Sequence, residues 1–436
     1  MCMVLVLAVC TAELPAIVPD APIDVRAFGA AADGKTDATA AFAQALSAAA
    51  ARGGGTVTVP AGLFLIAGSV SVPTGVTLQG TWAGPHHGAW KQGSTLCLTG
   101  GRGKEDGPAA IQMGASSAVR GLTIVHPEQT LDDVQPYPWA IRGGGMHCTV
   151  ENVTLVNSFQ GIAMGPGSNE LHLIRNVFGC VLRRGVLIDG TTDIGRIENV
   201  HFNPHYWMRA EFPGTPGVWR VPGADGKTET RHPQWYMQEH LDAFIFGRTD
   251  WEYVLNTFVF GAKVGYLFTE TRAGMANGNF LGIGADWCTT CVKVEASQPM
   301  GILVTNGEFV GHHGCESAIE VEGKGVLQLC NSNFWGFQKR NVRLRGEDAF
   351  VSLNQCIFRD WGPVPEDAAV VEASGGALTV QGCAFMRPRR HIALGEKVKS
   401  AVIFGNTFTG APAIENAAKG DVKIDLNASY VPAKAK

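Results

Sequence analysis

Short segments that alternate apolar and polar residues recur along most of the chain, and many of them end at an Asn. Eight such segments end at Asn152, Asn176, Asn199, Asn256, Asn279, Asn306, Asn354 and Asn406. The intervals between them are 24, 23, 57, 23, 27, 48 and 52 residues, and Asn333 and Gly382 divide the last two. A unit of about 25 residues with three short β-strands is typical of one coil of a parallel β-solenoid. The pattern therefore predicts a solenoid in which each strand pairs with its equivalent in the next coil.

The recurring Asn residues have a structural purpose in such a fold. Asn adopts the left-handed conformation that a sharp bend requires, and its amide can hydrogen-bond the next Asn in a column. We therefore expect these residues to form the corner between the second and third strands, and we do not assign them to chemistry.

Two segments depart from the repeat. Residues 37–51 are rich in Ala, begin at Thr36 or Asp37 as N-cap and end before Gly53, which predicts a helix that covers the N-terminal end of the solenoid. The interval of 57 residues leaves residues 203–242 as one inserted loop. Loops of this length are commonly functional, and five Trp or Tyr residues in it indicate an ordered segment.

Composition excludes several classes of protein. The chain has 436 residues, of which 45% are hydrophobic, and a net charge of -4. A disordered chain or a protein with a general nucleic-acid-binding surface would be more polar or more basic. No apolar stretch reaches the ~18 to 20 residues that a membrane span needs.

The start of the chain and its Cys residues favour a secreted or otherwise extracytoplasmic protein without a dense disulfide framework. Residues 1–16 form an apolar run followed by small residues, as in a secretory signal, although no basic residue precedes the run. A buried apolar N-terminus is the alternative. The 11 Cys residues are scattered, and Cys288 and Cys291 form a lone C-x-x-C, so we predict no metal site.

One N-terminal stretch resembles a known family. Residues 24–37 read DVRAFGAAADGKTD, and after the Ala-rich segment residues 53–62 read GGGTVTVPAG. Together they resemble the N-terminal signature of the pectate-lyase superfamily, which includes polygalacturonase-related hydrolases, lyases and phage depolymerases. The resemblance implies an all-β, right-handed, single-stranded parallel β-helix over residues 17–436, and it implies work on carbohydrate. Asp132, Asp133 and residues 312–314 match the polygalacturonase motifs only loosely, so the resemblance does not assign the reaction.

Alternation within the first strand of each coil separates core from surface. These strands align as residues 161–165, 185–189, 243–247, 265–269, 291–295, 318–322 and 341–345. The predicted inward residues are Ile162, Met164, Val186, Ile188, Phe244, Phe246, Tyr266, Phe268, Val292 and Val294. The outward residues of later coils are charged and predict a solvated ladder of ion pairs: Lys293, Glu295, Glu320, Glu322, Arg343 and Arg345. In earlier coils the outward positions are small or apolar, which suggests a floor for a sugar ring.

This floor is the predicted site. Residues 126–139 and 203–242 would wall a cleft above Asp189, with aromatic rings to stack on sugars and charged groups to bind them. Hydrolysis of a glycosidic bond uses two carboxyl groups. We predict Asp189 with Asp250 as the first pair and Glu270 as a further catalytic candidate, while Asp286 and Glu308 are held in reserve. The predicted substrate-binding residues are Arg142, His205, Trp207, Arg209, Trp235, His240, Arg248 and Arg272.

Alternatives stay open at this point. Asp250 and Glu270 could be turn carboxylates paired with a neighbouring Arg. A polysaccharide lyase would instead use bases and cations of the insertion, such as His205, Tyr206 or His232, and a divalent cation such as calcium. The third alternative is a non-catalytic glycan-binding β-helix. A hydrolase needs no cofactor, the expected partner is a carbohydrate, and the sequence leaves monomer and homotrimer open.

Overall fold

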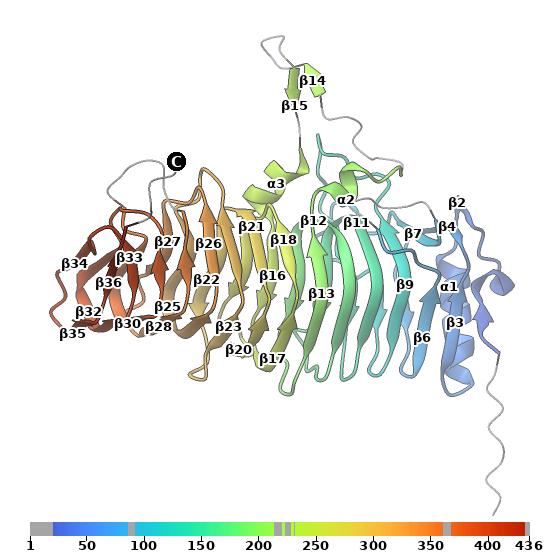
Figure 1. The fold of residues 1–436 in the computed structure, drawn as a ribbon. Helices are drawn as coiled ribbons and strands as arrows, with labels where there is room; N and C mark the ends of the chain where they lie inside the picture. Colours follow the sequence, from blue (N-terminus) through green and yellow to red (C-terminus); the bar gives the residue numbers. More distant parts are fainter. Residues whose placement is uncertain are drawn as a thin grey trace, which may run out of the picture.

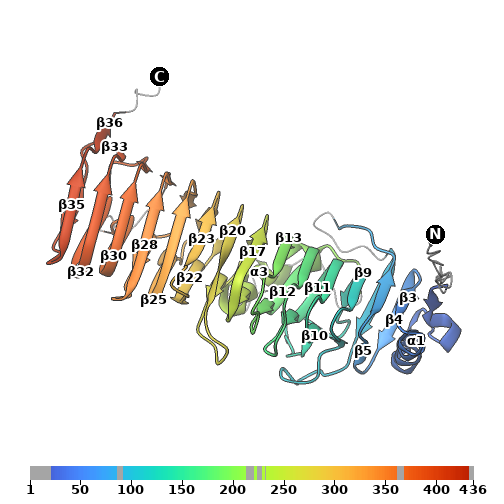
Figure 2. The ribbon, with the colours of Figure 1, turned by 90° about the horizontal axis from the view of Figure 1, so that it is seen from below.

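The chain folds into an elongated parallel β-solenoid of about 15 turns (Figures 1 and 2). The computed structural model describes residues 21–85, 92–212, 220–222, 228–230, 232–360 and 368–431. Each strand of the solenoid pairs in parallel with its equivalent one coil away. This confirms the predicted right-handed parallel β-helix.

The strands form three sheets that run along the solenoid. The first sheet contains β5 (Val70–Val72), β8 (Ile111–Met113), β10 (Trp139–Gly143), β16 (Asp242–Phe246), β19 (Val264–Phe268), β22 (Thr290–Ala296), β27 (Arg340–Leu344) and β34 (Ile414–Asn416). The second contains β1 (Ile23–Asp24), β3 (Gly55–Val59), β6 (Val76–Gly80), β13 (Arg196–Phe202), β17 (Thr249–Leu255), β20 (Ala276–Leu281), β23 (Ile302–Thr305), β28 (Ala349–Asn354) and β35 (Asp421–Asp425). The third contains β2 (Asp33–Asp37), β4 (Gly62–Ile66), β7 (Ser94–Leu98), β18 (Phe258–Phe260), β21 (Gly284–Cys288), β24 (Glu308–Gly311), β26 (Asn333–Gly336), β29 (Ile357–Phe358), β31 (Ala384–Phe385), β33 (Thr407–Thr409) and β36 (Ala428–Tyr430). Long strands turn the corner between sheets: β9 (Ala118–Val125), β11 (Thr149–Met164), β12 (Leu173–Ile188), β25 (Ser317–Cys330), β30 (Val371–Gln381) and β32 (Ile392–Phe404), and the end of β13 pairs with β18 in the third sheet.

The predicted register of the first sheet is confirmed. Ile162 pairs with Val186, Val186 with Phe244, Phe244 with Tyr266, and Tyr266 with Val292. All ten residues predicted to point inward are buried. Aromatic rings of successive coils stack inside the solenoid, as the ring centroids of Phe244 and Tyr266 at 4.8 Å illustrate. The core is therefore one continuous column of apolar side chains.

The Asn corner is confirmed in part. Five of the predicted corner residues have a left-handed backbone: Asn152, Asn176, Asn199, Asn256 and Asn306. The amide of Asn176 donates to Asn152 Oδ1 at 2.9 Å, and Asn199 donates to Asn176 in the same way at 2.9 Å. The prediction is wrong for three others, because the left-handed position falls beside them: Asn279 lies within β20 ahead of Gly282, Asn354 precedes Gln355, and Asn406 follows Gly405. Asn331 rather than Asn333 forms its corner, whereas Gly382 does so as expected.

The N-terminal end carries the expected helix. The 3-10 helix η1 (Val25–Phe28) and α1 (Thr39–Ala51) lie at this end of the solenoid, with Phe42 and Leu46 of α1 fully buried (Figure 2). The helix begins two residues later than predicted, with Ala38 as its N-cap. Asp37 still accepts a hydrogen bond from the backbone N–H of Thr39 at 3.0 Å, just before the helix.

The insertion is partly helical and projects from one side of the solenoid (Figure 1). Its described elements are α2 (His205–Met208), the antiparallel pair β14 (Arg220–Pro222) and β15 (Thr228–Thr230), and α3 (Pro233–His240). It follows the third-sheet end of β13 and precedes β16, so it sits at the corner where the third sheet meets the first. None of the described helices is long and apolar enough to span a membrane. The predicted signal at residues 1–16 lies outside the described residues.

Candidate functional site

Of the three predicted catalytic carboxylates, Asp189 and Glu270 lie just beyond first-sheet strands and Asp250 lies at the start of β17, and each one has structural partners. Asp189 is 6% exposed, and its Oδ1 accepts hydrogen bonds from Arg248 N and Thr271 Oγ1, both at 2.8 Å. A methyl group on Gly247 would approach this same oxygen to 2.6 Å. The carboxylate therefore links the turns at Arg248 and Thr271 by hydrogen bonds and leaves no room for a sugar at that oxygen.

Asp250 and Glu270 are paired as well. Asp250 forms an ion pair with Arg248 and accepts a hydrogen bond from Gln298 Nε2 at 2.7 Å. Glu270 pairs with Lys324 Nζ at 3.0 Å. The ion pair of Asp250 agrees with the alternative in which this carboxylate pairs with a neighbouring Arg. Glu270 pairs instead with a Lys from another coil.

The described parts of the two predicted walls do not lie beside Asp189. The insertion enters before β16, whereas Asp189 follows the last residue of β12, so the two lie at opposite edges of the first sheet. A strand of five residues separates these edges, which is about 16 Å. The predicted floor is also covered at Ala163, which is buried against Ala109 and Trp139.

The predicted substrate-binding residues are scattered among different environments. Trp207, a residue of α2, has a fully buried side chain that cannot stack on a ligand. Arg142 donates to the carbonyl of Gly165 at 3.0 Å, and Arg248 is held by Asp250. The ring of His205, on α2, lies 5.9 Å from that of His232, and the ring of His240, on α3, lies 4.2 Å from that of Tyr236. Arg209, at the end of α2, and Arg272, in a turn, are exposed. Of the predicted set only Trp235, which is 53% exposed, lines a described pocket.

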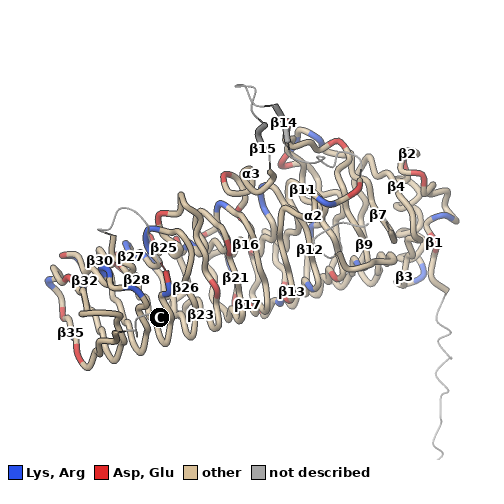
Figure 3. Tube along the Cα trace, turned by 45° about the horizontal axis from the view of Figure 1, so that its top comes forward, with Lys and Arg blue, Asp and Glu red and all other residues tan. Residues whose placement is uncertain are grey.

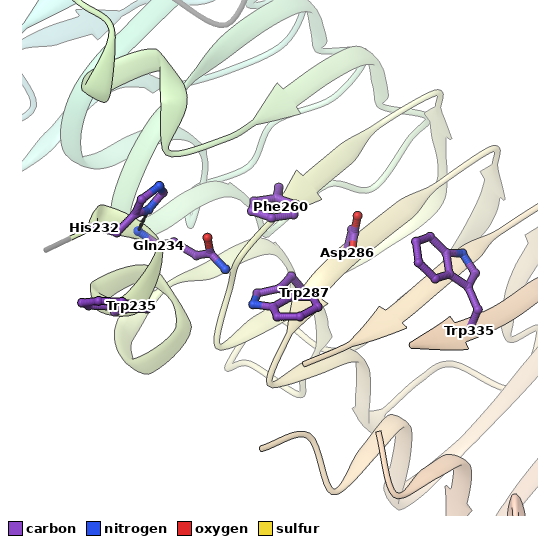
Figure 4. Close-up of a pocket in the computed structure, with 7 residues that line it drawn as sticks. All are labelled: His232, Gln234, Trp235, Phe260, Asp286, Trp287 and Trp335. Atoms are coloured by element: carbon purple, nitrogen blue, oxygen red, sulfur yellow. Dashed lines mark hydrogen bonds between the residues drawn. The ribbon is translucent and has the colours of Figure 1, made fainter. Parts of the chain in front are cut away.

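That pocket lies where α3 meets the third sheet (Figure 4). Its volume is about 580 Å³, and its lining residues are His232, Gln234, Trp235, Phe260, Asp286, Trp287 and Trp335. The size is within the range of small-molecule binding sites. Four aromatic rings with one carboxylate among them give the surface an apolar face and a polar centre.

Strand alternation positions the floor of the pocket. Phe260 is in register with Asp286, Asp286 with Val310, and Val310 with Trp335. The neighbouring residues Val259, Ala285, Phe309 and Phe334 point inward and are buried. Phe260, Asp286 and Trp335 of this column line the pocket, whereas Val310 between Asp286 and Trp335 is buried; Figure 4 shows Asp286 between Phe260 and Trp335.

Helix α3 is fixed against this floor by specific contacts. Gln238 Nε2 donates to the carbonyl of Trp287 at 2.9 Å, and Thr289 Oγ1 donates to the carbonyl of Gln238 at 2.9 Å. Gly261 has a φ of +74°, and a Cβ there would come within 2.7 Å of Gln234 Cγ. Met237 is fully buried beneath the helix. These contacts make the wall of the pocket part of the solenoid.

The electrostatics of the pocket single out Asp286. Partial burial, with a smaller effect of the nearby Glu308 carboxylate, raises the pKa of Asp286 to about 6. Asp286 makes no ion pair with any residue that the structure describes. Glu308 is exposed and accepts a hydrogen bond from Trp335 Nε1 at 3.0 Å. Burial, and then the neighbouring His205, lower the pKa of His232 to about 4, so this imidazole is neutral near pH 7.

This arrangement combines two features of carbohydrate sites. Aromatic faces suit the apolar faces of sugar rings, and a carboxyl group that titrates near neutral pH suits proton transfer. Asp286 and Glu308 were held in reserve by the sequence, but Phe260, Trp287 and Trp335 were not singled out. The alternation of inward and outward residues in segments 258–260, 284–288 and 333–336 would have predicted this outward column, as the same alternation did for the first strand.

Comparison with known proteins supports the fold and the N-terminal resemblance. Residues 23–100 match the family model described as rhamnogalacturonase A/epimerase, pectate lyase-like. The N-terminal segment is pectate lyase-like. The resemblance seen in residues 24–62 is thus confirmed, and the match does not extend to the pocket. No curated protein sequence matches the chain.

Solved structures resemble the chain in fold over most of its length. The mannuronan C-5 epimerase AlgE6 A-module of Azotobacter vinelandii superposes with a TM-score of 0.54 at 14% identity, covering 94% of this chain and 100% of that one. The bacteriophage phi29 gene product 12 superposes with a TM-score of 0.57 at 11% identity, covering 94% of this chain and 56% of that one. At these identities the comparisons establish the β-helix architecture, and they leave the chemistry to the site itself.

Proposed function

We propose that the chain is a carbohydrate-active enzyme, a glycoside hydrolase that binds sugar in the pocket between α3 and the third sheet. The observation behind the proposal is the placement of two carboxyl groups, Asp286 and Glu308, on adjacent coils beside the aromatic rings. This replaces the site predicted around Asp189, whose carboxylates are engaged in structural contacts.

The two carboxyl groups suit different roles. Asp286, with its raised pKa, is protonated in mildly acidic solution and can donate a proton to the glycosidic oxygen as the bond breaks. Glu308 is the candidate base or nucleophile, and the Trp335 indole N–H orients its carboxylate. The register places Asp286 one coil and two residues from Glu308, which is about 8 Å between Cα atoms. Cα spacing alone leaves open whether the reaction inverts or retains the sugar configuration.

The aromatic residues would position the substrate. Trp287 stands at the end of β21 with a φ of +57°, a backbone conformation that a tryptophan rarely adopts. Its ring makes edge contacts with His313 and Phe337, with centroid distances of 5.7 and 5.5 Å. The ring is thereby held beside Asp286, where a stacked sugar would present its glycosidic oxygen to the carboxyl group.

The test is an incubation with a panel of neutral and uronic-acid glycans. New reducing ends without the ultraviolet absorbance of unsaturated uronates indicate hydrolysis, whereas both signals together indicate a lyase. Asp286→Asn should abolish the release of reducing ends. Asp189→Asn tests the rival site, and Asp425→Asn, at an exposed carboxylate far along the chain, is a matched control.

The outcomes separate the two sites. Loss of turnover in Asp286→Asn with activity kept in Asp189→Asn supports the proposal. Loss in folded Asp189→Asn with full activity in Asp286→Asn would overturn it in favour of the first-sheet site. Sugar binding without turnover on any substrate would favour a glycan-binding β-helix instead.

A further inference from the structure

The charge of the pocket bears on the class of carbohydrate that it accepts. Among the described residues that line it there is no Lys or Arg, whereas Asp286 lies within it and Glu308 adjoins it. The single imidazole, His232, is uncharged near pH 7. Above pH 6, where Asp286 is ionised, a uronate carboxylate placed here would meet two like charges, and at any pH the described lining offers no Lys or Arg to offset its loss of water.

The cations of the later coils belong to a different surface. Lys293 pairs with Glu295 at 3.2 Å and with Glu322 at 3.1 Å, and Arg340 pairs with Glu372 at 2.6 Å. These residues lie on the first sheet, and Figure 3 shows Lys or Arg interspersed with Asp or Glu along these coils. The ladder is neutralised internally and does not reach the pocket lining.

The long dimension of the pocket bears on ligand length. Its floor runs from Phe260 to Trp335 over three steps between coils. At ~4.8 Å per coil this is about 14 Å along the solenoid axis. Trp335 is 41% exposed at the far end, so its ring is available to a ligand. One sugar ring does not cover this length, whereas a short run of linked sugars does.

We infer that the pocket binds an uncharged oligosaccharide chain laid along the solenoid axis, with Trp335 stacking on a sugar distant from Asp286. The inference rests on the proposed function, since it assigns the ligand class of that same pocket. It excludes uronate polymers as ligands, because the described lining offers no positive charge to them. Trp335 becomes a specificity residue for chain length.

The test is calorimetric titration of the intact protein at pH 8, where ionised Asp286 cannot act as an acid and the pocket has its full negative charge. The probes are hexasaccharides of glucose, mannose, galactose and xylose, the corresponding monosaccharides, and hexamers of galacturonate and mannuronate. At least one neutral hexasaccharide should bind at least tenfold more tightly than its monosaccharide and than either uronate. Added sodium chloride should leave its Kd unchanged.

Variants locate the distal contact. Trp335→Ala should weaken hexasaccharide binding at least tenfold and by much more than it weakens monosaccharide binding, while Trp335→Phe, which keeps a stacking ring, should retain most of the affinity. Phe404→Ala, an exposed aromatic of β32 outside the pocket, is the control. The inference is overturned if a uronate hexamer binds as tightly as every neutral one, if no neutral hexasaccharide binds, or if Trp335→Ala leaves the hexasaccharide unaffected.

The two proposals fail separately. Neutral oligosaccharides that bind but release no reducing ends at pH 5 would refute the hydrolase and leave the ligand class standing. Reducing ends released from uronates, with no neutral ligand bound, would refute the ligand class and leave the hydrolase standing.

Discussion

Replacing Asp286 by Asn should lower activity and raise stability at once. Removal of a general acid typically lowers turnover by about 10²- to 10⁴-fold. This corresponds to about 3–5 kcal/mol of transition-state stabilisation. Asn has nearly the same shape as Asp, so the loss would reflect the missing proton and not a change of packing.

The pH dependence provides an independent signature. If protonated Asp286 is required, kcat/KM of the wild type should fall as the pH rises through about 6, which is the pKa of this carboxyl. The residual activity of Asp286→Asn should lack this limb. The measurement is kcat/KM between about pH 4 and pH 8 for both proteins.

The effect on stability has the opposite sign. The folded pKa of Asp286 lies above the ordinary 3.8, so the unfolded chain releases this proton more readily than the folded one; the cost to stability is absent well below pH 3.8, grows as the pH rises to about 6, and is constant above that. The shift would amount to about 3 kcal/mol for a fully shielded group, which partial exposure reduces to about 1–2 kcal/mol. Urea unfolding should therefore show Asp286→Asn to be more stable than wild type by this amount at pH 8, with little difference at pH 4.

Two results would refute the reasoning. An alkaline limb that persists unchanged in Asp286→Asn would show that another group controls it. Equal stability of the two proteins at pH 8 would show that Asp286 is not perturbed by its surroundings, and the argument for it as an acid would lose its physical basis.

The remaining predictions concern the second carboxylate and the solenoid itself. Glu308→Gln removes a negative charge beside Asp286, so the alkaline limb of whatever activity remains should move to lower pH; a limb that moves upward contradicts this. Asp189→Ala leaves the half-buried backbone N–H of Arg248 without its acceptor and removes the hydrogen bond from Thr271, so it should destabilise the fold by about 2–4 kcal/mol in urea unfolding, while kcat/KM stays near wild type under conditions where the variant is folded. Asn176→Ala should destabilise by about 1–2 kcal/mol more than Asn176→Gly, because Gly takes a φ of +53° without strain and Ala does not; equal unfolding midpoints would argue against a corner that strains Ala.

Much of the fold was predictable because its determinants are local. Alternating residues such as Val186 and Ile188 specify which face of a strand is buried, and the same alternation in each coil brings them into register. Asn176 marks a corner because its own backbone adopts the left-handed conformation. Where Gly282 or Gln355 takes that conformation instead, a neighbouring Asn misled the prediction, since the corner needs a conformation and not one residue type.

The site depended on contacts that strand periodicity does not contain. Asp189 ends a first-sheet strand as predicted, but its hydrogen bonds to turns about 60 and 80 residues later make it structural. Among the residues that the structure describes, no turn of another coil holds Asp286 in this way, and its pKa rises because the surrounding chain removes it from water. An isolated segment around either residue gives no hint of this difference.

The sequence by itself determined a parallel β-helix with an N-terminal capping helix, an apolar inward column and an aromatic insertion. Only the tertiary structure decided which sheet the insertion packs against. The cause is the packing of α3 against the third sheet. Gln238 of α3 donates a hydrogen bond to the carbonyl of Trp287, 49 residues later, and α3 thereby forms a wall beside Phe260, Asp286 and Trp335. Periodicity records how each strand faces the core, whereas a pocket exists only where separate segments meet.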